Sequence, residues 1–405
     1  MSVVTSKRRL AVIDSNFPWI QSGFRYWENL EIHRQLPDTL FFATNPYTDV
    51  SGQRQPTDFP APVHNFFELI PMAIEENITD IYCVFLSMAV SLIGREKLPG
   101  GGTVLGASRE LNILPFIKDQ KIKMHTTIYP GGGLQPDTPI HAIEIPRYYS
   151  TVFTNIQEVL SAYSRSIYVP GMINADFYAA KPKPNPYPIK LVFAAHSGIR
   201  KNFPDLIQAF NQLDDRFHLH IIGDWQPYLR LIKNQNYTFH GLLLPEQMRR
   251  VYQDCHVFVS CSKSDWTASD GFPTTAAGDA MATECLLVTT NSRMDRFVLQ
   301  SGWDYLEITE YRKLVDILRW VGDNFEQAMT IAANGSQKIR TLYNSKVVVR
   351  NKLLSMGFQP IPDPVNAAPA ADSQPVENDP ETEMKKFWDF PNWKNTLKNM
   401  VKKNR

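Results

Sequence analysis

The 405-residue chain has few cysteines and almost no net charge. Its four cysteines stand at positions 83, 255, 261 and 285, and none forms a C-x-x-C pair. This usage is typical of reduced core thiols in a cytosolic protein, and it argues against a disulfide framework or a cysteine metal site. The formal net charge of +1 gives no global attraction to a polyanion, so no nucleic-acid partner is expected.

Long apolar runs are also missing. A membrane-spanning helix needs about 18–20 apolar residues, and the longest candidate, residues 81–93, falls short of that length. Residues 1–9 lack the apolar core of a signal peptide. The sequence therefore predicts a cytoplasmic protein. With 43% hydrophobic and 20% charged residues, the chain has ample material for two domains with cores of their own.

Short apolar runs alternate with longer helix-permissive stretches. This alternation favours βα units built around parallel sheets. The runs expected to form strands are residues 10–14, 39–43, 81–85, 123–128, 151–154 and 166–169 in the first half, and 189–194, 218–222, 237–239, 256–260 and 286–290 in the second. The sequence thus predicts an α/β fold with two doubly wound sheets.

Proline marks the boundary between the two halves. Four prolines in residues 179–188 exclude a helix or a central strand, which predicts a hinge between an N-terminal domain, 1–178, and a C-terminal domain, 189–358. Residues 359–383 are rich in Pro, Ala, Asp and Glu and have no apolar periodicity, so they are predicted to be a disordered linker.

The last segment, residues 384–405, has a different pattern. Trp393, Leu397, Met400 and Val401 recur at helical spacing, and lysines occupy the other faces. This pattern predicts a basic amphipathic helix. Such a helix either lies on an anionic membrane surface, which would place the protein peripherally on the inner face of a membrane, or docks on the protein itself.

Two carboxylates bracket a turn in residues 261–282, directly after the expected strand 256–260. The segment reads C-S-K-S-D-W-T-A-S-D-G-F-P-T-T-A-A-G-D-A-M-A and passes from the turn into a helix-permissive run. A helix N-terminus offers unpaired N–H groups and a partial positive charge, which suit a diphosphate. The arrangement can hold a sugar at Asp270, a phosphate on the free amides and a ribose at Asp279.

This segment resembles the E-G-F-P-x…E-A-M-A signature of retaining glycosyltransferases of the double-Rossmann GT-B fold, family 4. The resemblance implies that Asp270, where the family has Glu, meets hydroxyls of the donor sugar. It also implies that the turn holds one residue more than in the family and that Asp279 faces the ribose. The alternative is that Asp279 is a solvated acidic residue on the helix. The turn residues expected to bind the donor are Gly271, Phe272, Pro273, Thr274 and Thr275.

Two cations follow the first expected strand of the second domain. Residues 193–210 are predicted to form strand, short loop and amphipathic helix, so Arg200 and Lys201 lie at the carboxyl end of the strand, where ligands of open α/β sheets bind. There they can neutralise a diphosphate leaving group. The stretch is similar to the family's G-R-x…K-G-x-x-x-L-I-x-A segment. That similarity implies that Lys201 binds the diphosphate and that His196 or Arg200 supplies the second contact; the alternative is a surface cation pair.

Weaker matches occur in the same order as in the family. Gly223 and Gly241 lie in segments similar to L-x-I-x-G-x-G and F-x-G-x-x-x-x-E, where the backbone passes close to the nucleotide. In the first domain, Gly23 resembles a loop glycine between acceptor and donor phosphate. His125 matches the family's histidine near the transferred sugar, with a purely structural role as the alternative. Residues 168–177 look like V-I-P-N-G-V-D-x-x-x-F, which closes the family's first domain.

The resemblance implies a complete function. Two Rossmann-like domains face a cleft, the second binding the donor and the first the acceptor. Asp270, Lys201 and His125 are then the expected catalytic residues of a retaining, metal-independent hexosyltransferase of polysaccharide biosynthesis. The donor is a nucleotide-diphosphate sugar, no cofactor is expected, and the acceptor is a glycan or lipid-linked. Two alternatives stay open: a nucleotide-sugar epimerase of the same fold, and a non-catalytic sugar-nucleotide-binding subunit.

Overall fold

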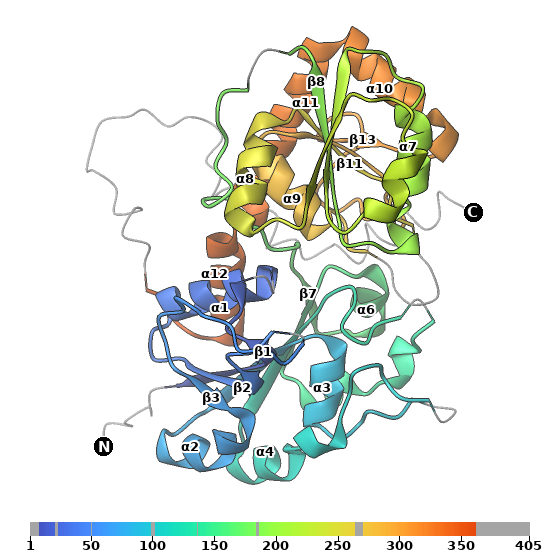
Figure 1. The fold of residues 1–405 in the computed structure, drawn as a ribbon. Helices are drawn as coiled ribbons and strands as arrows, with labels where there is room; N and C mark the ends of the chain where they lie inside the picture. The colour runs from blue at the N-terminus through green and yellow to red at the C-terminus, as the bar shows by residue number, and fades with distance from the viewer. Residues whose placement is uncertain are drawn as a thin grey trace, which may run out of the picture. The chain divides into compact units, whose positions relative to one another are not determined.

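Two parallel β-sheets organise the part of the chain that the structure describes (Figure 1). The computed structural model describes residues 8–20, 23–49, 51–98, 102–135, 137–183, 186–263 and 270–361. The predicted amphipathic helix, 384–405, and almost all of the predicted linker, 359–383, lie outside these ranges. We call the first sheet with its helices the first lobe and the second sheet with its helices the second lobe.

The first sheet has seven strands in the order β3-β2-β1-β4-β5-β6-β7, all paired in parallel. The strands are β1 (Leu10–Phe17), β2 (Leu40–Pro46), β3 (Val63–Asn65), β4 (Asp80–Val84), β5 (Lys123–Ile128), β6 (Thr151–Thr154) and β7 (Ser166–Tyr168). The α-helices between them are α1 (Phe24–Gln35), α2 (Leu69–Glu75), α3 (Leu86–Leu92), α4 (Leu114–Gln120), α5 (Ile145–Tyr148) and α6 (Gln157–Ala162).

The second sheet repeats this plan with six strands in the order β10-β9-β8-β11-β12-β13. The strands are β8 (Ile189–Ala194), β9 (Phe217–Ile222), β10 (Tyr237–Gly241), β11 (Val257–Ser260), β12 (Leu286–Thr289) and β13 (Leu306–Glu307). The α-helices are α7 (Phe203–Phe210), α8 (Pro245–Asp254), α9 (Thr275–Ala282), α10 (Leu314–Asp323) and α11 (Phe325–Lys338). In both sheets the strand order reverses beside the first strand, and ligands of open α/β sheets collect at such a switch point.

All the strands predicted from the sequence are present, with ends that differ by a few residues at most. The prediction missed β3 and β13, which have three and two residues and lie at sheet edges. Strands this short carry too few residues to show an apolar pattern. The four cysteines are buried and form no disulfide, as their spacing suggests.

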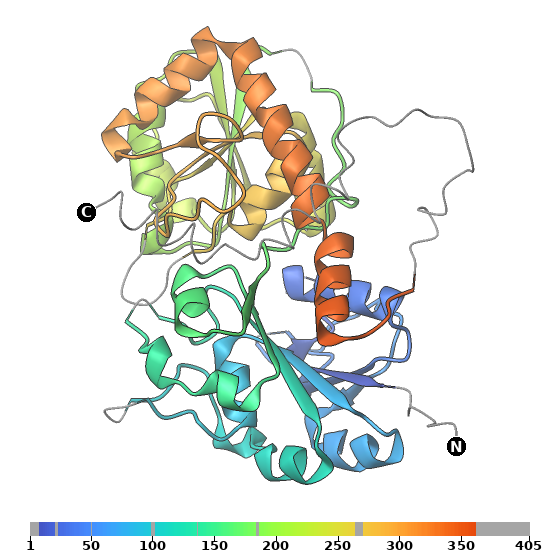
Figure 2. The same ribbon diagram turned by 180° about the vertical axis from the view of Figure 1, so that it is seen from behind.

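The chain returns to the first lobe after completing the second. The predicted hinge has no helix or strand in its described residues, 179–183 and 186–188. The predicted C-terminal domain, 189–358, does not stay with its own sheet, however. Its last helix, α12 (Ser345–Met356), packs against α1, and the Gln35 side-chain amide donates a hydrogen bond to the Lys346 carbonyl at 2.8 Å (Figure 2).

A buried ion pair fastens α12 to the first lobe. Lys352 Nζ lies 2.7 Å from Glu28 Oε1 of α1, and it also donates hydrogen bonds to the hydroxyls of Tyr82, at 3.1 Å, and Tyr129, at 3.3 Å. Burial lowers the pKa of Lys352, and the neighbouring Glu28 carboxylate opposes that shift. Removing one member of such a pair leaves an uncompensated charge in the core.

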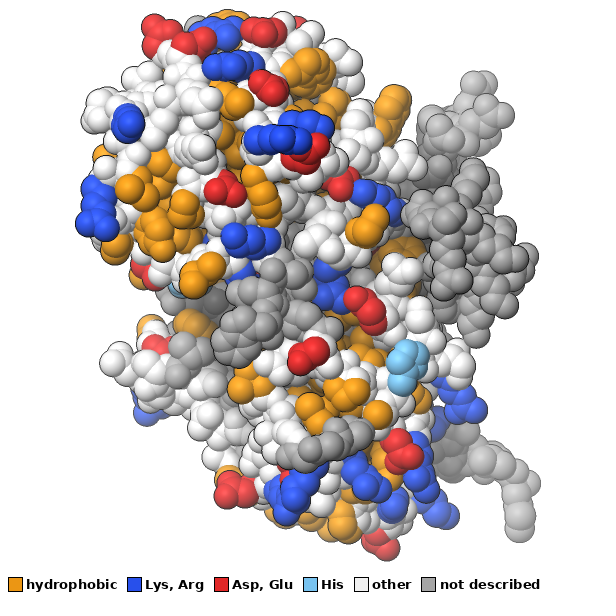
Figure 3. Space-filling model, turned by 90° about the vertical axis from the view of Figure 1, so that its right-hand side faces the viewer, with side chains coloured by type: hydrophobic (Ala, Val, Ile, Leu, Met, Phe, Trp, Pro, Cys, Tyr) orange, Lys and Arg blue, Asp and Glu red, His pale blue; other side chains and the backbone are white. Residues whose placement is uncertain are grey.

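Charged side chains of both signs are interspersed on the face shown in Figure 3, with small groups of apolar side chains between them. No broad region of one sign stands out on this face, in keeping with a formal net charge of +1. Within the described ranges, no helix has the length and apolar character needed to cross a bilayer.

We predict that Lys352→Ala lowers the free energy of unfolding by about 3–5 kcal/mol, because Glu28 is left buried and unpaired. The double replacement Glu28→Gln with Lys352→Met should recover most of that loss. Arg147→Ala, which removes an exposed ion pair with Glu144 in the same lobe, is the control and should cost under about 1 kcal/mol. Urea unfolding measures all three; equal losses for Lys352→Ala and Arg147→Ala would contradict the assignment.

Candidate functional site

Three of the singled-out side chains meet at the carboxyl ends of the second sheet. Arg200 and Lys201 lie on a single helical turn, Ile199–Lys201, directly after β8, and Asp270 lies on the connection between β11 and α9. Lys201 Nζ donates to Asp270 Oδ2 at 2.5 Å, and Arg200 Nη1 donates to Asp270 Oδ1. The backbone links the same two connections, because the Lys263 amide donates to the Arg200 carbonyl at 2.8 Å.

The cluster carries more positive than negative charge. Burial raises the pKa of Asp270, but attraction and hydrogen bonding from Lys201, with help from Ser262 and Arg200, outweigh burial and leave the pKa below its ordinary value. Burial lowers the pKa of Lys201, and Asp270 opposes that shift. Two cations against one carboxylate leave an excess of one positive charge, so the cluster suits an anionic ligand.

The turn after Asp270 leads into the first turn of α9. The Thr274 hydroxyl accepts a hydrogen bond from the Ala277 amide at 3.3 Å and caps the helix. The first turn of a helix leaves amides without intrahelical partners, and the helix dipole is positive at that end, so it attracts a phosphate. A cavity next to this turn is lined by Asp270, Gly271, Phe272 and Thr274, together with hydroxyls and amides of residues 289–292.

Gly223 and Gly241 hold the neighbouring strand ends together. Gly223 has φ 123°, and a Cβ built there would lie 2.0 Å from the Ala195 carbonyl oxygen, so only glycine fits. The Gly223 amide donates to the Gly241 carbonyl at 2.8 Å. The close approach at Gly223 therefore serves packing between strands, and Gly241 has open space around its Cα.

Arg200, rather than His196, stands beside Lys201. The His196 side chain is 87% exposed, and its Nδ1 lies 3.9 Å from Asp224 Oδ1. Asp224 is committed instead to Ser197, whose amide and hydroxyl both donate to it at 2.6 Å. Of the two residues expected to supply the second cation, the structure brings Arg200 to Asp270.

The expected role of Asp279 is not supported. Its carboxyl is buried in α9 and bonds to the Tyr178 hydroxyl, so it neither faces an open ribose site nor lies in solvent as a helical acid. The preceding position, Gly278, is covered too, because a Cβ there would lie 2.4 Å from Ile173 Cδ1. One residue rotates a helix position by about 100°, which turns Asp279 onto the packed face.

His125 is likewise placed away from the cluster. It lies in the first half of β5, buried, with Nε2 3.0 Å from Asp80 Oδ1 at the amino end of β4, and Asp80 also pairs with Arg8. The site forms at carboxyl ends of strands, so the structure does not bring His125 to the cluster, and its burial beside Asp80 favours the structural alternative. Gly23, with φ 69° and open space around its Cα, precedes α1 at the carboxyl end of β1.

Sequence reasoning missed the loop after β12. Asn291 clamps it: the Asn291 side-chain amide donates to the Asp295 carbonyl at 2.7 Å, and Asn291 Oδ1 accepts from the Asp295 amide at 3.0 Å. Arg293 of the same loop pairs with Glu158 of α6 at 2.8 Å. Polar residues directly after a predicted strand were the available signal, because that position is the carboxyl edge of a parallel sheet.

No arrangement for a metal ion is found in the described ranges, in which no group of three or more His, Cys, Asp or Glu side chains could hold one. The positive charges that the cluster itself can offer to a phosphate are those of Arg200 and Lys201. Lys201 Nζ and Arg200 Nη1 are already directed at one point, Asp270.

Part of the second lobe matches a known protein family by sequence. Residues 188–317 match the sequence model of the family Glycosyl transferases group 1. No curated protein matches the chain by sequence. The match covers most of the second lobe, including Arg200, Lys201 and Asp270.

The fold is similar to solved glycosyltransferase structures. HepE from Anabaena, solved with UDP and glucose, has a TM-score of 0.62 and 13% identity over 87% of this chain and 100% of that one. A glycosyltransferase from Rickettsia africae has a TM-score of 0.59 and 12% identity over 86% of this chain and 98% of that one. The sucrose-phosphate synthase of Thermosynechococcus elongatus has a TM-score of 0.58 and 12% identity over 87% of this chain and 98% of that one. The predicted α/β fold of the GT-B type is thereby confirmed.

We predict that Asp279→Asn flattens the dependence of stability on pH. Burial holds the pKa of Asp279 well above its ordinary value of 3.8, and the Tyr178 hydrogen bond offsets this only in part. The folded protein therefore keeps a proton that the unfolded chain releases, so this stabilisation is full below pH 3.8 and is lost as pH rises toward the folded pKa. The variant has no such proton.

The measurement is the melting temperature between pH 5 and pH 8. The melting temperature of the unmodified protein should fall more across this range than that of Asp279→Asn. Asp323→Asn, which alters an exposed carboxyl of the same lobe, is the control and should keep the original slope. Parallel slopes for Asp279→Asn and the unmodified protein would show that Asp279 is ionised in the fold.

Proposed function

Since residues 188–317 match the family Glycosyl transferases group 1, we propose that the chain moves a sugar from a nucleotide-diphosphate sugar to a glycan or lipid-linked acceptor. The observation that carries this proposal is the positive cluster of Arg200, Lys201 and Asp270 next to the first turn of α9. A diphosphate is the anion that both features suit. Because HepE was solved with UDP and with UDP-glucose, UDP is a suitable first probe.

Donor binding changes the partners of Asp270. In the structure, its carboxylate accepts hydrogen bonds from both cations. A diphosphate brings its own negative charge and takes over Lys201 and Arg200, and Asp270 is released to accept hydrogen bonds from hydroxyls of the donor sugar. The two cations then exchange the Asp270 carboxylate for the diphosphate as their partner. Neither cation is left unpaired, which limits the free-energy cost of burying their charges.

The same cations assist the chemical step. As the bond between the sugar's anomeric carbon and the diphosphate oxygen breaks, its electron pair goes to that oxygen, and Lys201 and Arg200 stabilise the charge that develops there. The acceptor hydroxyl oxygen forms the new bond to the anomeric carbon, and its proton passes to the departing diphosphate. We propose that the new bond forms on the face that the diphosphate leaves, with retention of configuration and without a metal ion or other cofactor.

The first prediction from this function concerns UDP affinity. Lys201→Ala should weaken UDP binding by roughly 10–100-fold, since a charge-assisted hydrogen bond is worth about 1.5–3 kcal/mol. Asp270→Asn should leave UDP affinity unchanged or raise it, because the internal competitor is removed, while sugar release or transfer falls. Titration calorimetry measures the affinities.

Lys313→Ala removes an exposed lysine of the same lobe and is the matched control. It should bind UDP as the unmodified protein does. Undiminished UDP binding by Lys201→Ala would refute the diphosphate assignment, and a large loss with Asp270→Asn would refute competition between Asp270 and the diphosphate.

The stereochemical proposal is tested without knowing the acceptor. Slow hydrolysis of the α-linked donor UDP-glucose, followed by proton NMR in excess EDTA, should release α-glucose first. Initial release of β-glucose would mean inversion, and complete loss of hydrolysis in EDTA with recovery on added Mg²⁺ would mean that a metal takes part.

We further propose that this is a cytoplasmic protein that contacts the inner face of a membrane through residues 384–405. The support is sequence alone: Phe387, Trp388 and Trp393 accompany lysines at positions 394, 398, 402 and 403. The full chain should float with vesicles that contain anionic lipid, and a chain ending at Ile361 should not. Equal flotation of both chains would remove the segment from this role and weaken the case for a lipid-linked acceptor.

A further inference from the structure

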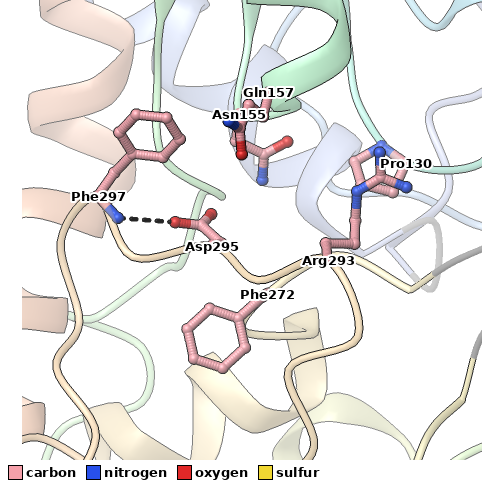
Figure 4. A pocket seen from close by; sticks show the side chains of 7 residues that line it. All are labelled: Pro130, Asn155, Gln157, Phe272, Arg293, Asp295 and Phe297. Carbon is pink, nitrogen blue, oxygen red and sulfur yellow. Dashed lines mark hydrogen bonds between the residues drawn. The ribbon is translucent and has the colours of Figure 1, made fainter. Parts of the chain in front are cut away.

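A second cavity lies beside the Asp270 cluster and draws on both lobes (Figure 4). The first lobe contributes Asn155, which follows β6, and Gln157, the first residue of α6. The loop after β12 contributes Asp295 and Phe297 of the second lobe. We call this space the Asp295 pocket. The side chains come from the carboxyl ends of their sheets, where ligands of open α/β folds bind.

One polar atom that lines the Asp295 pocket has no hydrogen-bond partner among the described residues. Asn155 is 9% exposed, and its side-chain oxygen is buried without a hydrogen-bond partner among the described residues. Buried amide oxygens are rarely left without a donor, so this atom calls for one from a ligand or water. Figure 4 shows the Asn155 side chain directed toward the space in front of Asp295.

Asp295 presents a second acceptor to the same space. It is 8% exposed, and one carboxyl oxygen accepts from the Phe297 amide at 3.1 Å. Burial raises the pKa of this carboxyl to about 6, against the lowering effects of the Phe297 amide, Arg293 and Arg296. A carboxyl that titrates near neutrality can either accept a hydrogen bond from a ligand hydroxyl or donate one to it.

The loop that carries Asp295 is held in a strained shape. Met294 has φ 52°, a left-handed conformation that is uncommon for a side chain of this kind, and the Asn291 clamp fixes the turn around it. Strain of this type persists where the surroundings enforce it, and it clusters at ligand sites. Here it directs Asp295 inward while leaving Met294 exposed.

The charges exclude a second phosphate in the Asp295 pocket. Arg293, the cation in its lining, is already paired with Glu158 at 2.8 Å, and Asp295 adds a carboxyl. Phe272, Phe297 and Pro130 supply apolar surface. A carboxyl, amides and aromatic rings around one space suit a neutral ring that has hydroxyls at its edge and C–H groups on its faces.

Phe272 and Arg293 line this pocket and also the cavity that contains Asp270. A ring in the Asp295 pocket would therefore lie next to the sugar that departs from the diphosphate. We propose that the Asp295 pocket is a sugar subsite in which Asp295 and Asn155 hold hydroxyls of a sugar ring, either the ring of the donor or a ring of the acceptor. This inference rests on the proposed function.

Two variants on different elements test the subsite. Asp295→Asn removes the carboxyl and keeps an oxygen that accepts from the Phe297 amide. Asn155→Leu removes the side-chain amide and keeps a side chain of similar shape. Asp323→Asn, outside the pocket, is the control. Melting curves check that each variant is folded, and the two positions are independent, so one unfolded variant leaves the other informative.

The donor arm compares UDP with UDP-glucose, UDP-galactose and UDP-N-acetylglucosamine by calorimetry. If the pocket holds the donor ring, the affinity for at least one UDP-sugar falls at least roughly tenfold in both variants, as for loss of a hydrogen bond to a polar or charged group. UDP affinity stays constant, because the nucleotide does not reach the pocket.

The acceptor arm uses UDP-saturated protein with methyl glucopyranosides and methyl galactopyranosides, observed by saturation-transfer NMR. If the pocket holds an acceptor ring, binding of at least one pyranoside disappears in both variants, while all calorimetric affinities stay constant. The control variant should behave as the unmodified protein in both arms.

The inference alone is overturned if the protein binds UDP and both pocket variants match the control in both arms. A protein that does not bind UDP at all overturns the proposed function, and this subsite with it. The two failures are thus distinguished by the UDP titration of the unmodified protein.

Discussion

The site depends on one carboxylate shared between two cations. Asp270 holds Arg200 and Lys201 in place, and through them it fixes the connection after β8 against the connection after β11. Without it, two partly buried positive charges would face each other across a short distance, which is costly. The bridge also leaves the cluster with one uncompensated positive charge, so the interaction that organises the site leaves it receptive to an anion.

The parts of the chain are joined by contacts that reach far along the sequence. α12 returns to the first lobe and is secured there by Lys352 and Glu28. The proline-rich connection is also fastened, because the Gln253 side-chain amide donates to the Ala179 carbonyl at 2.6 Å and Lys183 Nζ donates to the Tyr252 carbonyl at 3.0 Å. The chain crosses between the lobes in two places, at residues 179–188 and before α12, so the predicted hinge is one of two connections.

The sequence allowed the central strands and the cationic cluster to be predicted, and the reasons are physical. Buried parallel strands are continuous apolar runs, and Lys201 and Asp270 each lie in the connection that follows such a run. The buried positions of Asp279 and His125 were not foreseen, because burial depends on the rotation of a helix and on the position within a strand, which a family resemblance leaves open. Asp295 and Asn155 were missed because they come together only when carboxyl ends of two different sheets meet.

The most direct test is a crystal structure of the protein with UDP. The diphosphate should lie within hydrogen-bond distance of Lys201 and Arg200 and against the first-turn amides of α9, with Asp270 released from at least one of the two cations. A complex in which UDP occupies another part of the molecule while Asp270 still bridges both cations would contradict the account at its centre.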